Sequence, residues 1–65
     1  MKVLKAIDDD IHRQIHRNLR EFGYASLTLA EVEEGVKAYL DGKSSGNIIA
    51  MMAGNMLEEN GFVEL

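Results

Sequence analysis

The stretch Leu27-Thr-Leu-Ala-Glu-Val32 carries the clearest structural signal in the sequence. Thr28 and Glu31 have the spacing of a capping box, in which each side chain accepts a hydrogen bond from a free backbone amide at a helix start. Leu27 and Val32 have the spacing of the hydrophobic staple that accompanies such a box. The stretch therefore predicts a helix that continues to Asp41-Gly42, where glycine can terminate it. Its apolar face contains Leu29, Val32, Val36, Tyr39 and Leu40.

A second amphipathic segment precedes this helix. Its apolar residues recur at spacings of four, four and three, which places them on one helical face. Aspartates at positions 8–10 suit a helix N-terminus, because they can cap it and because they face the positive end of its dipole. We expect this helix to start near Asp8 or Asp9 and to end at Phe22, before Gly23. The apolar positions are Ile11, Ile15, Leu19 and Phe22.

A third helix is expected from Ser44 or Ser45, either of which can cap it, to Asn60-Gly61. Its apolar residues cover about half of the circumference, so we expect it to contact both other helices. Ala50, Ala53 and Gly54 form a low-relief patch where a neighbouring helix can approach closely. The apolar positions are Ile48, Ile49, Met52, Ala53, Met56 and Leu57.

The two ends of the chain leave alternatives open. Leu4 and Ile7 keep the phase of the first helix, so an earlier helix start and a short extended arm over residues 2–5 both fit the sequence. At the other end, Phe62 can fold back on the third helix, or residues 62–65 can pair as a short strand.

Together these patterns predict one domain over residues 1–65, an all-α three-helix bundle of helix-turn-helix-like order that allows a short terminal β pairing. A chain of 65 residues has a thin core, and it has no cysteine for a disulfide, which favours oligomerisation or a larger partner. The N-terminus lacks the hydrophobic region of a signal peptide, and the longest uncharged run, residues 44–57, is too short for a membrane helix. We therefore expect a cytoplasmic protein.

The charge distribution points to the first helix as a binding surface. The chain carries a net charge of −4, but Arg13, Arg17 and Arg20 lie close together, on the side opposite the apolar face. Arginine suits bidentate contacts with carboxylate or phosphate groups. We predict that these arginines contact a partner. The alternative is a solvated face, partly neutralised by nearby acidic residues at helical spacings, which are Asp9, Asp10 and Glu21.

A second predicted contact surface lies on the third helix. Met51 points away from the apolar arc, beside Asn55, and an exposed methionine is typical of adaptable binding surfaces. We expect Met51 and Asn55 to lie in an exposed or interface patch, whereas Met52 and Met56 are expected to be core residues.

The sequence contains few residues that could form a metal site or a catalytic site. His12 and His16 are four residues apart and can project to one side of a helix, but two ligands do not complete a zinc site. Their alternative role is that of ordinary residues at the border of the apolar face. No phosphate loop, nucleophilic triad or pair of enclosed carboxylates can be identified. We therefore expect no metal, no cofactor and no catalysis.

From Leu27 to Val63, a capped helix, a glycine turn, a longer helix and Asn-Gly-Phe-Val follow one another. This order resembles the helix-turn-helix core of winged-helix regulators, and residues 56–63 resemble the end of their recognition helix. The resemblance implies a DNA-binding role. Such a role is disfavoured because the corresponding recognition positions contain no arginine or lysine. Those positions are Ser45, Asn47, Ala50, Met51 and Asn55.

The sequence is therefore interpreted as a small, non-enzymatic protein-binding or regulatory module that also self-associates. The alternative is a small helix-turn-helix, winged-helix-like DNA-binding regulator.

Overall fold

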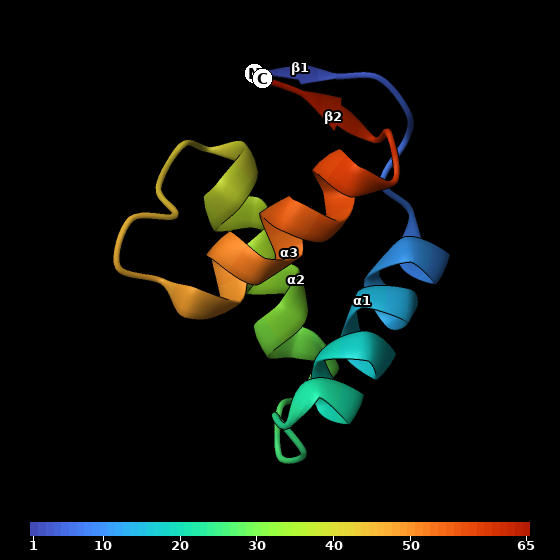
Figure 1. The fold of residues 1–65 in the computed structure, drawn as a ribbon, viewed down its shortest axis with the longest axis vertical. Coiled ribbons are helices and arrows are strands. Elements are labelled where there is room, and N and C mark those ends of the chain that lie inside the picture. Colours follow the sequence, from blue (N-terminus) through green and yellow to red (C-terminus); the bar gives the residue numbers. More distant parts are fainter.

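Three helices and a two-stranded ribbon make up the fold (Figure 1). The structure is a computed structural model and describes residues 1–65. It confirms the predicted all-α three-helix bundle and the short β pairing of the chain ends. The elements in chain order are β1 (Lys2–Val3), α1 (Asp9–Phe22), α2 (Leu29–Leu40), α3 (Ile48–Glu59) and β2 (Val63–Glu64).

The starts of α1 and α2 are capped as predicted. The Asp8 carboxylate accepts a hydrogen bond of 3.0 Å from the backbone amide of Ile11. At α2 both halves of the capping box are present: the Glu31 amide donates to Thr28 Oγ1 at 3.2 Å, and the Thr28 amide donates to Glu31 Oε1 at 2.9 Å. Local hydrogen bonds therefore fix where both helices begin.

The start of α3 differs from the prediction. Ser44 and Ser45 do not cap this helix; Asn47 does, since its side chain accepts a hydrogen bond of 3.1 Å from the Ala50 amide. Residues 44–47 instead form a turn, in which the Asn47 amide donates to the Ser44 carbonyl at 2.9 Å. Gly46 has a φ of 75°, in the left-handed region, and a helix could not continue through that conformation.

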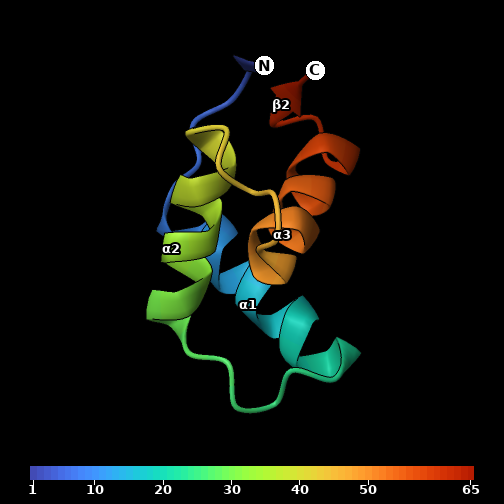
Figure 2. The same cartoon turned by 90° about the vertical axis from the view of Figure 1, so that its left-hand side faces the viewer.

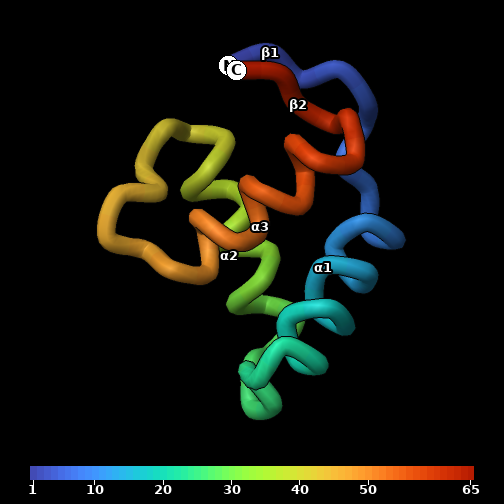
Figure 3. The backbone as a smooth tube through the Cα atoms, in the orientation of Figure 1, coloured from blue at the N-terminus to red at the C-terminus, as the bar shows by residue number.

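The end of α3 leads directly into the ribbon. The amides of Gly61 and Phe62 donate to the carbonyls of Glu58 and Leu57, which is the Schellman pattern. The chain then pairs with its own N-terminal arm in antiparallel register, Lys2 opposite Glu64 and Val3 opposite Val63. Figure 3 shows the two chain ends side by side. The N-terminal residues thus form an extended arm, and the first helix does not start earlier. At the C-terminal end, the fold-back of Phe62 on the third helix and the short strand occur together.

The closest helix packing is between α2 and α3. Figure 2 shows these helices side by side, with α1 running across their lower part. Gly35 and Gly54 are buried at the α2–α3 contact, where a Cβ on Gly54 would overlap the Tyr39 ring. The low-relief patch predicted on α3 therefore receives α2. The buried core consists of Ile15, Leu19, Val32, Val36, Tyr39, Ala50, Ala53, Leu57 and Val63.

Candidate functional site

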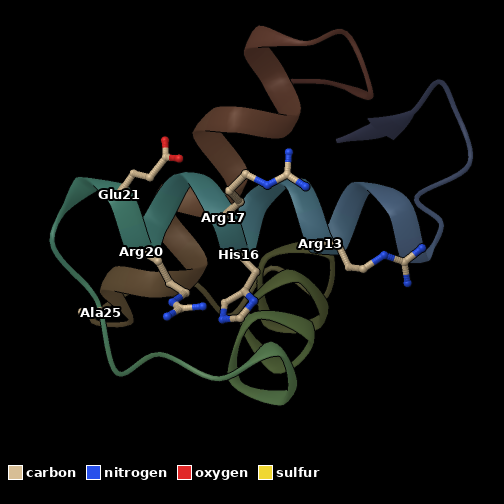
Figure 4. A pocket seen from close by; sticks show the side chains of 6 residues that line it. All are labelled: Arg13, His16, Arg17, Arg20, Glu21 and Ala25. Carbon is tan, nitrogen blue, oxygen red and sulfur yellow. The ribbon is translucent and has the colours of Figure 1, made fainter.

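The solvent side of α1 carries the predicted arginines. The opposite side of this helix places Ile15 and Leu19 in the core, with exposed fractions of 3% and 0%. This amphipathic geometry leaves all three arginines exposed. They border an open hollow of about 530 Å³ between α1 and the loop that follows it (Figure 4). The lining residues are Arg13, His16, Arg17, Arg20, Glu21 and Ala25.

The three guanidinium groups do not converge on one point. Arg13 forms a salt bridge with Asp10, one turn earlier on α1. Arg17 and Arg20 form no salt bridge within the chain. In Figure 4, Arg20 extends to the same side of α1 as His16, whereas Arg17 and Glu21 extend to the other side. Arg17 and Arg20 are therefore the two guanidinium groups that remain available to a partner.

His16 lines the hollow and holds the loop between α1 and α2 against α1. Its Nε2 lies 2.6 Å from the Leu27 carbonyl oxygen, so the ring N–H donates to the loop between α1 and α2. The same loop is held by the amides of Tyr24 and Leu27, which donate to the carbonyls of Leu19 and Tyr24 at 3.0 and 3.1 Å. These bonds place the small side chain of Ala25 at the edge of the hollow. The loop path therefore keeps the space beside Arg20 open.

The histidine pair does not form a metal centre in this structure. His12 Nδ1 lies 2.7 Å from the Asp8 carbonyl oxygen, and His16 is engaged with the loop, so each ring is tied to a different backbone oxygen. No group of three or more histidine, cysteine, aspartate or glutamate residues has the geometry to hold a metal ion.

Acidic residues bound the arginine stretch along α1. Asp8, Asp9 and Asp10 precede it, and Glu21 follows Arg20 directly. At the rise of an α-helix, the stretch from Arg13 to Arg20 spans about 10 Å. The cationic surface is therefore short and has carboxylates at both ends.

The second predicted surface lies apart from the hollow. Met51 is 47% exposed, and Asn55 is exposed beside it on the outer side of α3. Ile48, which the helical pattern assigned to the apolar face, is 55% exposed one turn before Met51. It is the first residue of α3. No residue of α3 lines the arginine hollow, so the structure does not bring the two predicted surfaces into one pocket.

Phe22 corrects a further expectation. The sequence pattern placed it on the apolar face of α1, but its exposed fraction is 73%. Its ring stacks on Tyr24, with centroids 6.5 Å apart. As the last residue of α1, Phe22 lies beyond the part of the helix that reaches the core.

A groove of about 290 Å³ lies between α1 and the end of α3, and the sequence patterns do not indicate it. Its floor is apolar and its rim contains neutral amides, a composition that no short motif signals because the two helices contribute separately. The lining residues are Ile11, Gln14, Ile15, Asn18, Met56, Leu57, Asn60 and Phe62.

Comparison of the chain with protein-family models, curated proteins and solved structures finds no match. The longest helix, α1, has 14 residues, fewer than the roughly 20 that a bilayer-crossing helix needs, so none of the three could span a membrane.

Proposed function

We propose that this chain is a small, non-enzymatic protein-binding module that docks an acidic segment of a partner on the arginine face of α1. We define the arginine face as Arg13, Arg17 and Arg20. The observation that carries the proposal is the pair Arg17 and Arg20, which are exposed and have no carboxylate partner within the chain. Their action would be stoichiometric and regulatory, and we place the protein in the cytoplasm.

The charges around the arginine face favour a protein partner over nucleic acid. A nucleic-acid backbone presents a continuous row of phosphates, and affinity comes from neutralising several of them. Along α1, such a row would soon meet the aspartates at positions 8–10 or Glu21. The net charge of −4 adds a general repulsion. A partner with one or two acidic side chains avoids the first cost and meets a smaller repulsion, because it carries far fewer negative charges than a nucleic acid.

A comparison of two probes tests this proposal. The first probe is a fluorescently labelled peptide that contains two glutamates among neutral residues. The second is a duplex DNA that carries the same label and is used at the same concentration. Fluorescence anisotropy at low ionic strength is expected to show tighter binding of the peptide. Tighter binding of the duplex, with a steep dependence on salt, would instead support the winged-helix-like DNA regulator.

Self-association belongs to the same proposal and uses the outer side of α3. Ile48 and Met51 are both about half exposed and lie one turn apart, beside the neutral Asn55. Exposed apolar side chains that adjoin one another are typical of contact surfaces. We expect sedimentation equilibrium to show a reversible dimer that Met51→Glu weakens. An unchanged dimer in that variant, or a wild-type chain that stays monomeric at millimolar concentration, would contradict this part of the proposal.

A further inference from the structure

Phe22 and the groove between α1 and α3 lie on one face of α1. Phe22 follows Asn18 by four residues and Ile15 by seven, so the three side chains share one stripe of the helix. Ile15 and Asn18 line the groove, whereas the Phe22 ring is 73% exposed at the end of the helix. The stripe therefore carries an open groove and, further along, an uncovered aromatic ring.

The groove suits an aromatic side chain. Its volume is about 290 Å³, and its apolar lining includes Met56 and Phe62, both half-buried. No charged residue lines it, so a ring that enters the groove removes no charged group of the lining from water. Methionine adapts its shape and makes favourable contacts with aromatic rings. The groove therefore matches the chemistry of the ring that the same chain leaves exposed.

The spacing along α1 allows two copies to exchange these features. The α1 residues of the groove are centred between Gln14 and Ile15, and Phe22 lies about 11 Å further along the helix axis. Two α1 helices that pack antiparallel about a two-fold axis at Asn18 bring the Phe22 ring of each copy to the groove of the other. Asn18 then faces Asn18 of the second copy, where each amide can donate a hydrogen bond and accept one.

Charges beside the stripe match in this arrangement. Arg17 and Glu21 extend to the same side of α1 and form no salt bridge within the chain (Figure 4). A two-fold axis at right angles to the helices brings this side of one copy against the same side of the other. Glu21 of the second copy then lies about 3 Å along the helix axis from Arg17. The pair occurs twice, so the contact is complementary in charge as well as in shape.

From these observations we infer that the groove between α1 and α3 binds Phe22 of a second copy of this chain. The contact is additional to the one proposed on the outer side of α3 and uses none of its residues. It does not depend on the acidic partner, because Arg20 extends to the other side of α1.

Cysteine cross-linking tests the inference, since the chain contains no cysteine of its own. In Asn18→Cys the two new thiols face each other across the axis, where a disulfide needs Cα atoms about 4.4–6.8 Å apart. Glu34→Cys is the matched control, because Glu34 is also an exposed helical residue but belongs to α2. The measurement is the initial rate of covalent dimer formation with diamide, divided by the reactivity of each thiol toward a small disulfide reagent. We expect Asn18→Cys to cross-link faster than Glu34→Cys.

Second substitutions in the Asn18→Cys chain identify the contacts. Phe22→Ala is expected to lower the rate by at least about tenfold, because it removes two buried rings from the dimer. Arg17→Glu is expected to lower it by at least about threefold, and the addition of Glu21→Arg should restore it, since the charges of each pair are then exchanged. Met51→Glu should leave the rate unchanged. Circular dichroism checks that each variant keeps its helical content.

Three outcomes would overturn the inference. The first is an equal rate for Asn18→Cys and Glu34→Cys, and the second is a rate that Phe22→Ala leaves unchanged. The third is a rate that Met51→Glu abolishes, because the copies would then meet on the outer side of α3. None of these outcomes bears on the binding of an acidic peptide, so the docking proposal for the arginine face stands or fails separately.

Discussion

Gly54 lies at a position where local preference and packing oppose each other. Glycine inside a helix costs about 1 kcal/mol relative to alanine, yet here it lets the Tyr39 ring pack directly on the α3 backbone. The sequence indicated a low-relief patch at this point of the helix. It could not identify Tyr39 as the side chain that fills the patch, because that depends on how α2 crosses α3.

Replacement of Gly54 by alanine is therefore expected to destabilise the protein despite the gain in helix propensity. The added Cβ would overlap the Tyr39 ring carbons, and overpacking of this kind costs about 1–3 kcal/mol. We expect a lower free energy of unfolding in urea titrations. The neighbouring Asn55→Ala is the control: Asn55 is exposed, so that variant should be neutral or slightly more stable. A Gly54→Ala variant as stable as Asn55→Ala would contradict this packing.

Tyr39 also makes stability depend on alkaline pH. Burial, together with the 2.8 Å hydrogen bond that its hydroxyl donates to Glu58 Oε2, raises the pKa of Tyr39 from 10.0 to about 12. The folded chain thus holds the phenol proton more tightly than the unfolded chain. Its contribution to stability is complete below pH 10 and is lost as the pH rises through 12.

Comparison with Tyr39→Phe isolates this effect, because the variant has no phenol to titrate. At neutral pH we expect the variant to be less stable, since it leaves Glu58 without its donor. The difference in the free energy of unfolding between the two proteins should shrink as the pH rises from 10 to 12. A constant difference across that range, measured by urea titration, would contradict the assignment.

Among the elements, the sequence predicted those whose signals are local. The bounds of α1 and α2 follow from capping residues and apolar periodicity, and the structure confirms them. The start of α3 was misplaced because Ser44, Ser45 and Asn47 can all cap a helix, and only the backbone conformation at Gly46 decides among them. The apolar pattern also assigns Phe22 and Ile48 to buried faces, but Phe22 is the last residue of α1, Ile48 is the first residue of α3, and both side chains are exposed.

The capping box at the start of α2 is expected to contribute measurably to the stability of the protein. Thr28→Ala removes the acceptor of the Glu31 amide, and loss of an N-cap of this type costs about 1 kcal/mol. For a domain of this size, such a loss lowers the melting temperature by about 4–8 °C. Calorimetry should show this decrease, whereas Thr28→Ser, which keeps the oxygen, should retain most of the stability. Equal melting temperatures for Thr28→Ala and Thr28→Ser would show that the cap contributes nothing.

The same capping box holds the Glu31 carboxylate in a charged form. Two hydrogen bonds from Thr28 lower the pKa of Glu31: the one from the backbone amide has the larger effect, and the one from the hydroxyl has the smaller. The charged Glu31 carboxylate therefore contributes its full share to the free energy of unfolding above the ordinary pKa of 4.5. This share is lost as the pH falls below 4.5 and through the lowered pKa of the folded chain. We expect the stability difference between wild type and Glu31→Gln to decrease on acidification. A difference independent of pH in the acidic range would contradict this role.

Across the whole molecule, the side of α1 that carries the arginines could be predicted, whereas the hollow could not. Winding the sequence as a helix places Arg13, Arg17 and Arg20 opposite Ile15 and Leu19, as the structure has them. The hollow also needs the path of the loop after α1, which the bond from His16 to the Leu27 carbonyl fixes. The groove between α1 and α3 likewise depends on the packing of two distant segments.

Binding of the two-glutamate peptide to two double variants tests the central claim most directly. Arg17→Ala with Arg20→Ala and Lys37→Ala with Lys43→Ala each remove two exposed positive charges, but only the first pair belongs to the arginine face. We predict that the arginine variant loses at least about fivefold in affinity, while the lysine variant changes by less than about twofold. Equal losses in the two variants would show that only net charge matters and would contradict a docking site on α1.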